Sequence, residues 1–397
     1  MNESLLKAII LSKGVVFTEA AGMYAIRNKA KLQNLVYNAP IGFSHDTPQE
    51  LLLTGLDGYS VVVSCISPHN FEDLVIIDYN NGNFFVKYQS EIIENIKVNC
   101  VKEPTYYSLK TKEGIPFKRL ISSCGLDELN IWPWHDCNIS KKCRFCGANK
   151  IFSKNKNKDL LSAKEISTIK NFWNNNKEVY FKNLKEAISL SIGEECFSEH
   201  MHVILISGNL SNDKIDIQAE IYSEIASHIK PIVKDKATEG IVAVTIPPQK
   251  DELLYKMKES GIDIVVFNLE VSNNPWFALN CPGKAELGRD FFIQKLIKAT
   301  HVFGENNVWC NFVLGLEPIC QLLEFCNYLA CKGIVPSANV LHLDQGNTLN
   351  CIPPSVDDIL CFYKELNKII VDKKMKPFYC EKALRTSLTN EAYAGRI

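Results

Sequence analysis

The sequence predicts an α/β protein whose larger part is an incomplete (β/α) barrel, preceded by a mainly β domain. From about residue 200 onward, short apolar strand candidates alternate with helix candidates, a pattern typical of βαβ units around a parallel sheet. We count about six such repeats, fewer than the eight of a closed barrel. Before residue 120, short β-branched and aromatic runs are separated by turn signals instead.

The 397 residues are enough for two or three domains. We therefore divide the chain into a β-rich N-terminal domain over residues 1–115, a barrel over 116–350 and a C-terminal extension over 351–397. In the first part, strands are expected at 15–17, 60–66, 74–79 and 83–88. The Asn80-Asn81-Gly82-Asn83 segment predicts a hairpin over 78–85.

The barrel is built from alternating elements. Its strands are expected at 178–181, 202–206, 241–246, 262–269, 308–315 and 339–343. Its helices are expected at 159–174, 214–229, 250–260, 288–303 and 318–332. Parallel strands joined in this way have right-handed crossovers, and barrels place their sites at the carboxyl ends of the strands.

Composition excludes several classes of protein. Hydrophobic residues make up 46% and charged residues 22%, which argues against a disordered chain or a disulfide miniprotein. A net charge of −1 gives no basic field that would favour nucleic acid as a partner. The first residues lack the basic start and cleavage site of a secretory signal, and no apolar run reaches 18 residues. We therefore expect a cytoplasmic protein without a membrane partner, whose 15 cysteines are reduced thiols or metal ligands.

Three cysteines lie within ten residues: Cys137, Cys143 and Cys146. Their thiolates converge if the chain loops back, and they suit zinc or the iron of an iron–sulfur cluster. A tetrahedral zinc site needs a fourth ligand, for which His135 is the candidate, and it would make the protein a non-catalytic binding module. A 4Fe–4S cluster held by three cysteines leaves one iron open. A plain electron-transfer protein is disfavoured because a fourth cysteine is missing.

The Cys137-x5-Cys143-x2-Cys146 loop resembles the cluster loop of radical SAM enzymes. Most of these space their cysteines x3 and x2, but x5 occurs in a minority, such as the biotin-synthase-like maturation enzyme of the iron–guanylylpyridinol cofactor. Phe145 matches the aromatic residue that precedes the third cysteine and lies along the adenine of S-adenosylmethionine. The resemblance implies a partial (β/α)6 barrel of radical SAM type, a 4Fe–4S cluster, S-adenosyl-L-methionine and a reductant such as flavodoxin or ferredoxin.

Further motifs follow in the order of that family. Ser207, Gly208 and Asn209 stand where it carries a Gly-Gly-Glu-like turn that receives the methionine amino group. Asn268 and Glu270 end the strand over 262–269, where the resemblance implies contacts to the ribose or methionine part of the cofactor.

Arg289 opens the next helix and matches an arginine that pairs with the methionine carboxylate. A solvent-exposed charge at a helix start is the alternative interpretation. The loop before it holds Lys284, which either reaches an anionic substrate or faces solvent.

The last two motifs close the set. Gly315 and Glu317 resemble the Gly-Leu-x-Glu-like turn near the adenine, although a glutamate in a first helical turn also suits the helix dipole. His342 and Asp344 end the last strand at the same face, and we name Asp344 and Glu270 as the catalytic candidates.

The resemblance implies reductive cleavage of S-adenosylmethionine and abstraction of hydrogen from a small molecule, in cofactor or natural-product biosynthesis. A peptide substrate stays open because a β-rich domain can present an edge strand. The sequence does not identify the substrate. The late cysteines Cys351, Cys361 and Cys380 are too widely spaced to form a compact second motif.

Overall fold

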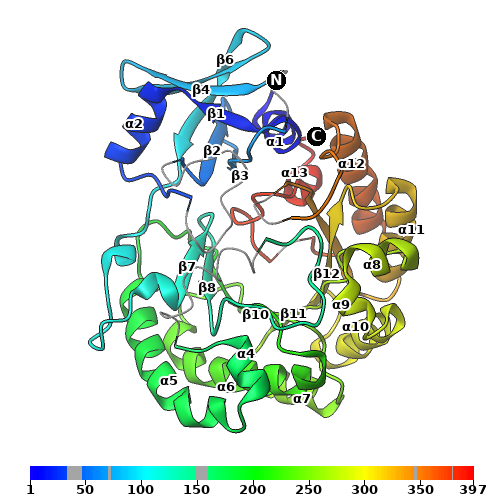
Figure 1. Cartoon of the computed structure of the whole chain (residues 1–397). Coiled ribbons are helices and arrows are strands. Elements are labelled where there is room, and N and C mark those ends of the chain that lie inside the picture. Colours follow the sequence, from blue (N-terminus) through cyan, green and yellow to red (C-terminus); the bar gives the residue numbers. More distant parts are fainter. Residues whose placement is uncertain (34–46, 70–72, 148–159, 344–346, 378) are drawn as a thin grey trace.

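The computed structural model describes residues 1–33, 47–69, 73–147, 160–343, 347–377 and 379–397 (Figure 1). The described residues form two sheets. A six-stranded sheet has the order β1-β4-β5-β6-β2-β3, and a seven-stranded sheet has the order β13-β12-β11-β10-β9-β8-β7. The α/β class predicted from the sequence is confirmed.

The six-stranded sheet belongs to the first hundred residues. Its strands are β1 (Val15–Phe17), β2 (Glu50–Gly55), β3 (Ser60–Ser64), β4 (Val75–Asn80), β5 (Asn83–Tyr88) and β6 (Glu91–Cys100). The predicted hairpin is confirmed, because β4 and β5 pair antiparallel up to Asn80 opposite Asn83. Asn81 and Gly82 both have positive φ, as a two-residue hairpin turn requires.

Two helices in this region were not expected from the sequence. They are α1 (Glu3–Lys13) and α2 (Glu19–Arg27), with Asn2 and Thr18 as side-chain caps. Helix α1 escaped notice because it is buried on almost all sides, including Ser4 and Lys7. A helix without a polar face lacks the periodicity that identifies helices in a sequence.

The seven-stranded sheet carries six parallel strands in chain order. Its strands are β7 (Ile121–Cys124), β8 (Glu128–Ile131), β9 (His202–Ile206), β10 (Ile241–Val244), β11 (Ile264–Val266), β12 (Val308–Leu314) and β13 (Val335–Val340). Strands β8 to β13 pair in parallel, and β7 is antiparallel to β8. Because β13 and β7 are the two edges, the sheet does not close into a full barrel.

One predicted strand is wrong. Residues 178–181 lie inside helix α5 (Phe172–Ser191), and β8 is the first parallel strand instead. The apolar residues of α5 recur at helical spacing and are buried together: Trp173, Tyr180, Phe181, Leu184, Ala187 and Ile188. The last strand starts earlier than expected, and its Pro336 is tolerated because β13 is an edge strand.

Helices line the outside of the curved sheet in Figure 1. The barrel helices are α4 (Ala163–Thr168), α5, α6 (Ile215–Val233), α7 (Glu252–Glu259), α8 (Asn274–Asn280), α9 (Pro282–Ala285), α10 (Arg289–Phe303) and α11 (Ile319–Ala330). Short 3-10 turns are η1 (Thr105–Ser108), η2 (Phe117–Arg119) and η4 (Asn212–Lys214). No helix in the described ranges is long and apolar enough to cross a membrane.

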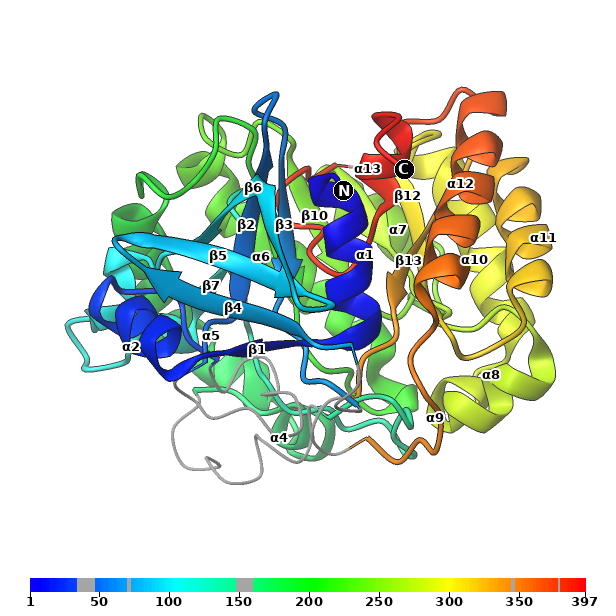
Figure 2. The same cartoon turned by 90° about the horizontal axis from the view of Figure 1, so that it is seen from above.

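The chain ends with α12 (Val356–Asp372) and α13 (Thr389–Tyr393), and the two termini lie side by side in both views (Figures 1 and 2). Arg396 pairs with Glu3 at 2.8 Å, and the Asn2 side chain donates to the Arg396 carbonyl. The residues after α12 therefore contact the first helix as well as the seven-stranded sheet. The division into three domains stays a prediction.

Candidate active site

The cysteine loop follows β8 and is fixed to the turn after β9. The buried Trp134 donates its indole N–H to the Gly208 carbonyl at 2.6 Å, and the Asn138 amide donates to the Asn209 carbonyl at 2.7 Å. A Cβ on Gly208 would overlap the Asp136 carbonyl and come within 2.7 Å of the Cys137 Cα. Glycine at position 208 thus permits the cysteine loop to lie against the sheet.

The other end of the loop lies against α8 and α9. The Arg144 amide donates to the Asn280 carbonyl at 2.9 Å, and a Cβ on Gly283 would overlap the Lys141 carbonyl. The Asp136 carboxylate accepts from the Ala163 and Lys164 amides at the start of α4. Hydrogen bonds and close packing therefore hold the loop against the turn after β9, against α8 and α9, and against the start of α4.

The three thiols differ in exposure: Cys137 and Cys143 are half-buried, and Cys146 is exposed. A hydrogen bond from the Cys281 thiol and the nearby Lys284 ammonium lower the pKa of Cys143. A lower pKa favours the thiolate, which is the form that binds metals.

A single zinc ion does not fit these thiols as they stand. Two sulfur ligands of one zinc ion lie at most about 4.6 Å apart, because each Zn–S bond is about 2.3 Å. In the described ranges, the three cysteines and His135 belong to no group of three or more ligand residues whose ligand atoms all lie within 4.8 Å of one another. The His135 ring instead stacks on Trp132 with 5.3 Å between centroids. In a cluster the three thiolates bind different irons, so wider spacing suits a cluster better than one ion.

Glu270 follows β11 at the carboxyl end of the sheet. Its backbone has a φ of 72°, which is uncommon for a residue with a side chain and typical of functional sites. Its carboxylate accepts from the Lys284 ammonium at 2.8 Å, and Lys284 also donates to the Asn268 carbonyl. The expectation that Lys284 faces solvent or substrate is wrong, since it is buried and paired.

Lys284 stays a cation in this position. Burial lowers its pKa, but Glu270 and the thiols of Cys143 and Cys281 outweigh burial and raise the pKa above the usual value of 10.5. A buried positive charge therefore stands beside the cysteine loop, where it would favour an anionic metal cluster.

A cavity of about 330 Å³ joins the cysteine loop to the strand ends. Phe145 and Cys146 line it together with Glu270. Val313 of β12 and His342 after β13 also line it. The loop cysteine and the strand-end carboxylate thus open into one space, at the face where barrels place their sites.

Other predicted residues lie outside this cavity. Arg289 donates to the Ser272 carbonyl, and its guanidinium lies 4.6 Å from the centroid of Phe325. Glu317 accepts from the amides of Ser272 and Asn273 and from the Ser272 hydroxyl, and burial raises its pKa. Both side chains therefore organise the turn after β11.

Gly315, with a φ of 112°, packs against Pro354 and lines two further cavities beside Glu317. The Ser207 hydroxyl is 2.7 Å from the Tyr222 hydroxyl of α6. Asp344 lies outside the described residues.

Sequence reasoning missed most residues of the cavity wall, Gln49 and Arg385 among them. Gln49 precedes β2 of the six-stranded sheet, and Arg385 lies in the segment after α12. Neither is part of a motif or a periodic pattern. Only their joint position at the cavity identifies them.

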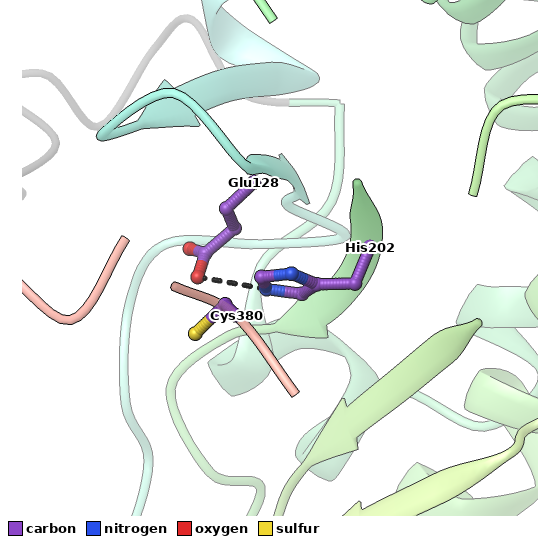
Figure 3. A group of neighbouring side chains, drawn as sticks. All are labelled: Glu128, His202 and Cys380. Atoms are coloured by element: carbon purple, nitrogen blue, oxygen red, sulfur yellow. Dashed lines mark hydrogen bonds and ion pairs between the residues drawn. The ribbon is translucent and has the colours of Figure 1, made fainter. Parts of the chain in front are cut away.

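A second group of metal-ligand residues lies at the opposite end of the sheet (Figure 3). Glu128 and His202 are the first residues of β8 and β9, and Cys380 comes from the segment after α12. Their ligand atoms lie within 4.8 Å of one another, and all three residues are buried. The His202 Nε2 lies 3.1 Å from the Glu128 carboxylate, and burial raises the pKa of the Cys380 thiol. These three buried side chains pack the segment after α12 against the first residues of β8 and β9.

The chain is similar to one curated protein and to several solved structures. No family model matches the chain. The chain is 24% identical over 267 residues to the bacteriochlorophyllide c C-7(1)-hydroxylase of Chlorobaculum limnaeum, a radical SAM enzyme. This likeness supports the resemblance to radical SAM enzymes that the cysteine loop indicates. The match covers 64% of the chain and 62% of the hydroxylase, less than two thirds of that relative's length.

Two solved structures resemble parts of the chain. The hydrogenase maturase HydG from Carboxydothermus hydrogenoformans is 15% identical, with a TM-score of 0.39 over 62% of this chain and 51% of that chain. Methylornithine synthase (PylB) is 12% identical, with a TM-score of 0.38 over 68% of this chain and 72% of that chain.

Proposed function

We propose that this chain is a radical SAM enzyme that binds a 4Fe–4S cluster through Cys137, Cys143 and Cys146 and reductively cleaves S-adenosylmethionine to act on a small molecule. One observation carries the proposal. Cys146 and Phe145 of the cysteine loop share a cavity with Glu270 at the carboxyl ends of the parallel strands. When bound, the reduced cluster and S-adenosylmethionine supply a 5′-deoxyadenosyl radical that abstracts a hydrogen atom. An electron donor such as flavodoxin or ferredoxin would reduce the cluster.

The described residues fit such a cluster. Three thiols stand on one loop, and backbone hydrogen bonds to the turns at 208–209 and 280 hold that loop. The Lys284 cation beside Cys143 offsets the negative charge that thiolates would bring. The chain's own task is to orient the cofactor and to exclude water around it.

We assign the S-adenosylmethionine contacts by position in the fold. The turn of Ser207, Gly208 and Asn209 lies against the cysteine loop and would receive the methionine amino group. The adenine would lie along Phe145 and near Gly315. The position of Gly315 directly after β12, at the carboxyl ends of the parallel strands, supports this placement of the adenine.

The polar ends of the cofactor need separate partners. Asn268 and Glu270 would contact the ribose or the methionine. Arg289 lies outside the cavity and contacts the Ser272 turn that Glu317 also holds, so its pairing with the methionine carboxylate stays a prediction from the sequence. The catalytic roles of Glu270 and Asp344 stay predictions.

Replacement of one cluster cysteine tests the proposal. In the full chain, purified and reconstituted without oxygen, Cys143→Ala should lose most of its iron and release no 5′-deoxyadenosine after reduction, because two thiolates do not hold a cluster in place. Cys331→Ala, at an exposed cysteine after α11, is the control and should match the wild type. Full iron loading with undiminished release from Cys143→Ala would contradict the proposal.

A further inference from the structure

The cavity beside Cys146 has a second wall that the radical SAM assignment does not explain. Gln49, just before β2, and Ser64 and Cys65, at the end of β3, line it, as do Arg385 and Thr386 of the segment after α12. In Figure 1 this red segment passes between β3 and the side of β12. The cavity is therefore closed by three parts of the chain, and its volume of about 330 Å³ is at the lower end of small-molecule sites.

A positive charge belongs to this wall. The Glu50 carboxylate lies 2.6 Å from the Lys31 ammonium and 2.7 Å from the Arg385 guanidinium. Lys31 and Glu50 are fully buried, whereas the Arg385 side chain is 11% exposed and lines the cavity. Arg385 is thus the cation that a molecule in the cavity would meet.

The other charged pair at the cavity is neutral. Glu270 is paired with Lys284 at 2.8 Å, so it does not cancel the charge of Arg385. The planar guanidinium of Arg385 suits a carboxylate, which it can bind through two parallel N–H···O hydrogen bonds.

Gln49 supplies a second feature of the same wall. Its side chain is 2% exposed, and neither its amide nitrogen nor its oxygen has a hydrogen-bond partner in the described part of the chain. The neighbouring Gln33 is different, since its amide donates to the carbonyls of Pro48 and Cys65. A buried carboxamide without partners is costly unless something that the protein binds completes its hydrogen bonds.

We propose that this cavity binds a small organic acid with one carboxylate, which pairs with Arg385 while a second polar group of the acid bonds to the Gln49 carboxamide. The rest of the molecule extends toward Cys146 and Glu270. The inference rests on the proposed function for the statement that this acid is the substrate, but the binding itself does not require the cluster.

Ligand-observed NMR on the full-length protein tests the binding. The probes are mandelate, 3-phenyllactate and 4-hydroxyphenylacetate, each compared with its uncharged carboxamide. At least one acid should bind about tenfold more tightly than its carboxamide, the ratio expected for one charge-assisted contact. Arg385→Met should bind that acid no better than the carboxamide.

Arg396→Met is the matched control, because Arg396 also lies after α12 and pairs with acids of the N-terminal region but does not line the cavity. It should bind the acid like the wild type. Gln49→Leu leaves the ion pairs untouched, so it tests the site even if Arg385→Met unfolds. It should keep or raise the melting temperature and weaken acid binding about fivefold or more, the loss of a hydrogen bond.

The inference is overturned if no acid binds more tightly than its carboxamide, if neither Arg385→Met nor Gln49→Leu changes binding, or if inorganic phosphate displaces the acid at lower concentration than a second carboxylate does. Release of 5′-deoxyadenosine by the wild type is measured in parallel. Release without acid binding would remove this inference alone, and acid binding without release would remove the proposed function.

Discussion

Lys7 of the first helix and Glu391 of the last helix form a buried ion pair, with 2.6 Å between Nζ and Oε1. Both side chains are at most 3% exposed, and Lys7 also donates to the Leu384 carbonyl. The partners are 384 residues apart, so the pair connects the two ends of the chain. Arg385 of the cavity wall lies in the segment between α12 and α13, so this ion pair helps to hold that wall in place.

Loss of one partner of this pair should be costly. Lys7→Met leaves the Glu391 carboxylate buried without a cation and should lower the free energy of unfolding by about 3–5 kcal/mol. Urea unfolding followed by circular dichroism at pH 7 measures the change. Lys87→Met is the control, because Lys87 pairs with Asp78 nearer the surface, and it should cost less than about 1 kcal/mol. Equal losses of unfolding free energy in the two variants would show that the buried pair stabilises the fold no more than the pair nearer the surface does.

The buried Glu50 should make stability depend on pH in the acid range. Burial raises the pKa of Glu50, but the charges of Lys31 and Arg385 outweigh burial and hold it below the ordinary value of 4.5. A carboxylate with a lowered pKa in the folded state stabilises the fold above its unfolded pKa. This contribution is lost as the pH falls through the folded pKa.

The comparison is therefore between wild type and Glu50→Gln. The difference in unfolding free energy should be largest at neutral pH and should shrink progressively as the pH falls below 4.5, the ordinary pKa of a glutamate in the unfolded chain. Glu259→Gln, at an exposed position of α7, serves as the control and should give a small difference at every pH. If the difference in unfolding free energy between wild type and Glu50→Gln grew toward low pH, the pKa of Glu50 would not be lowered in the folded state.

The fold was predictable where burial produces a simple pattern. The strands His202–Ile206 and Val308–Leu314 are apolar runs between helices, and the expected and observed bounds nearly coincide. Prediction of secondary structure failed where burial removed the periodicity of a helix or where a short apolar run within a helix looked like a strand. Helix α1 has almost no polar face, and the aromatic run at 178–181 looked like a strand although its neighbours continue a helical spacing.

The site was predictable only in its local part. Three cysteines within ten residues identify a metal loop from spacing alone, whereas the ion pair of Lys284 with Glu270 depends on the fold of the loop between them. Gln49 and Arg385 come from opposite ends of the chain and meet only through the packing of the six-stranded sheet and the segment after α12. No local pattern in one sequence predicts that residues so far apart along the chain line the same cavity.

The contact between Gly208 and the cysteine loop gives the last prediction. In Gly208→Ala the new Cβ would overlap the Asp136 carbonyl, which is backbone and has to shift. We expect a loss of about 1–3 kcal/mol in unfolding free energy, the usual cost of overpacking. Because the shift moves Cys137, iron per chain after reconstitution should fall below that of the wild type. Gly22→Ala is the control, since a Cβ there meets no atom within 4 Å, and it should retain iron and stability. Wild-type iron content in Gly208→Ala would show that the loop binds its cluster without this close approach to the sheet.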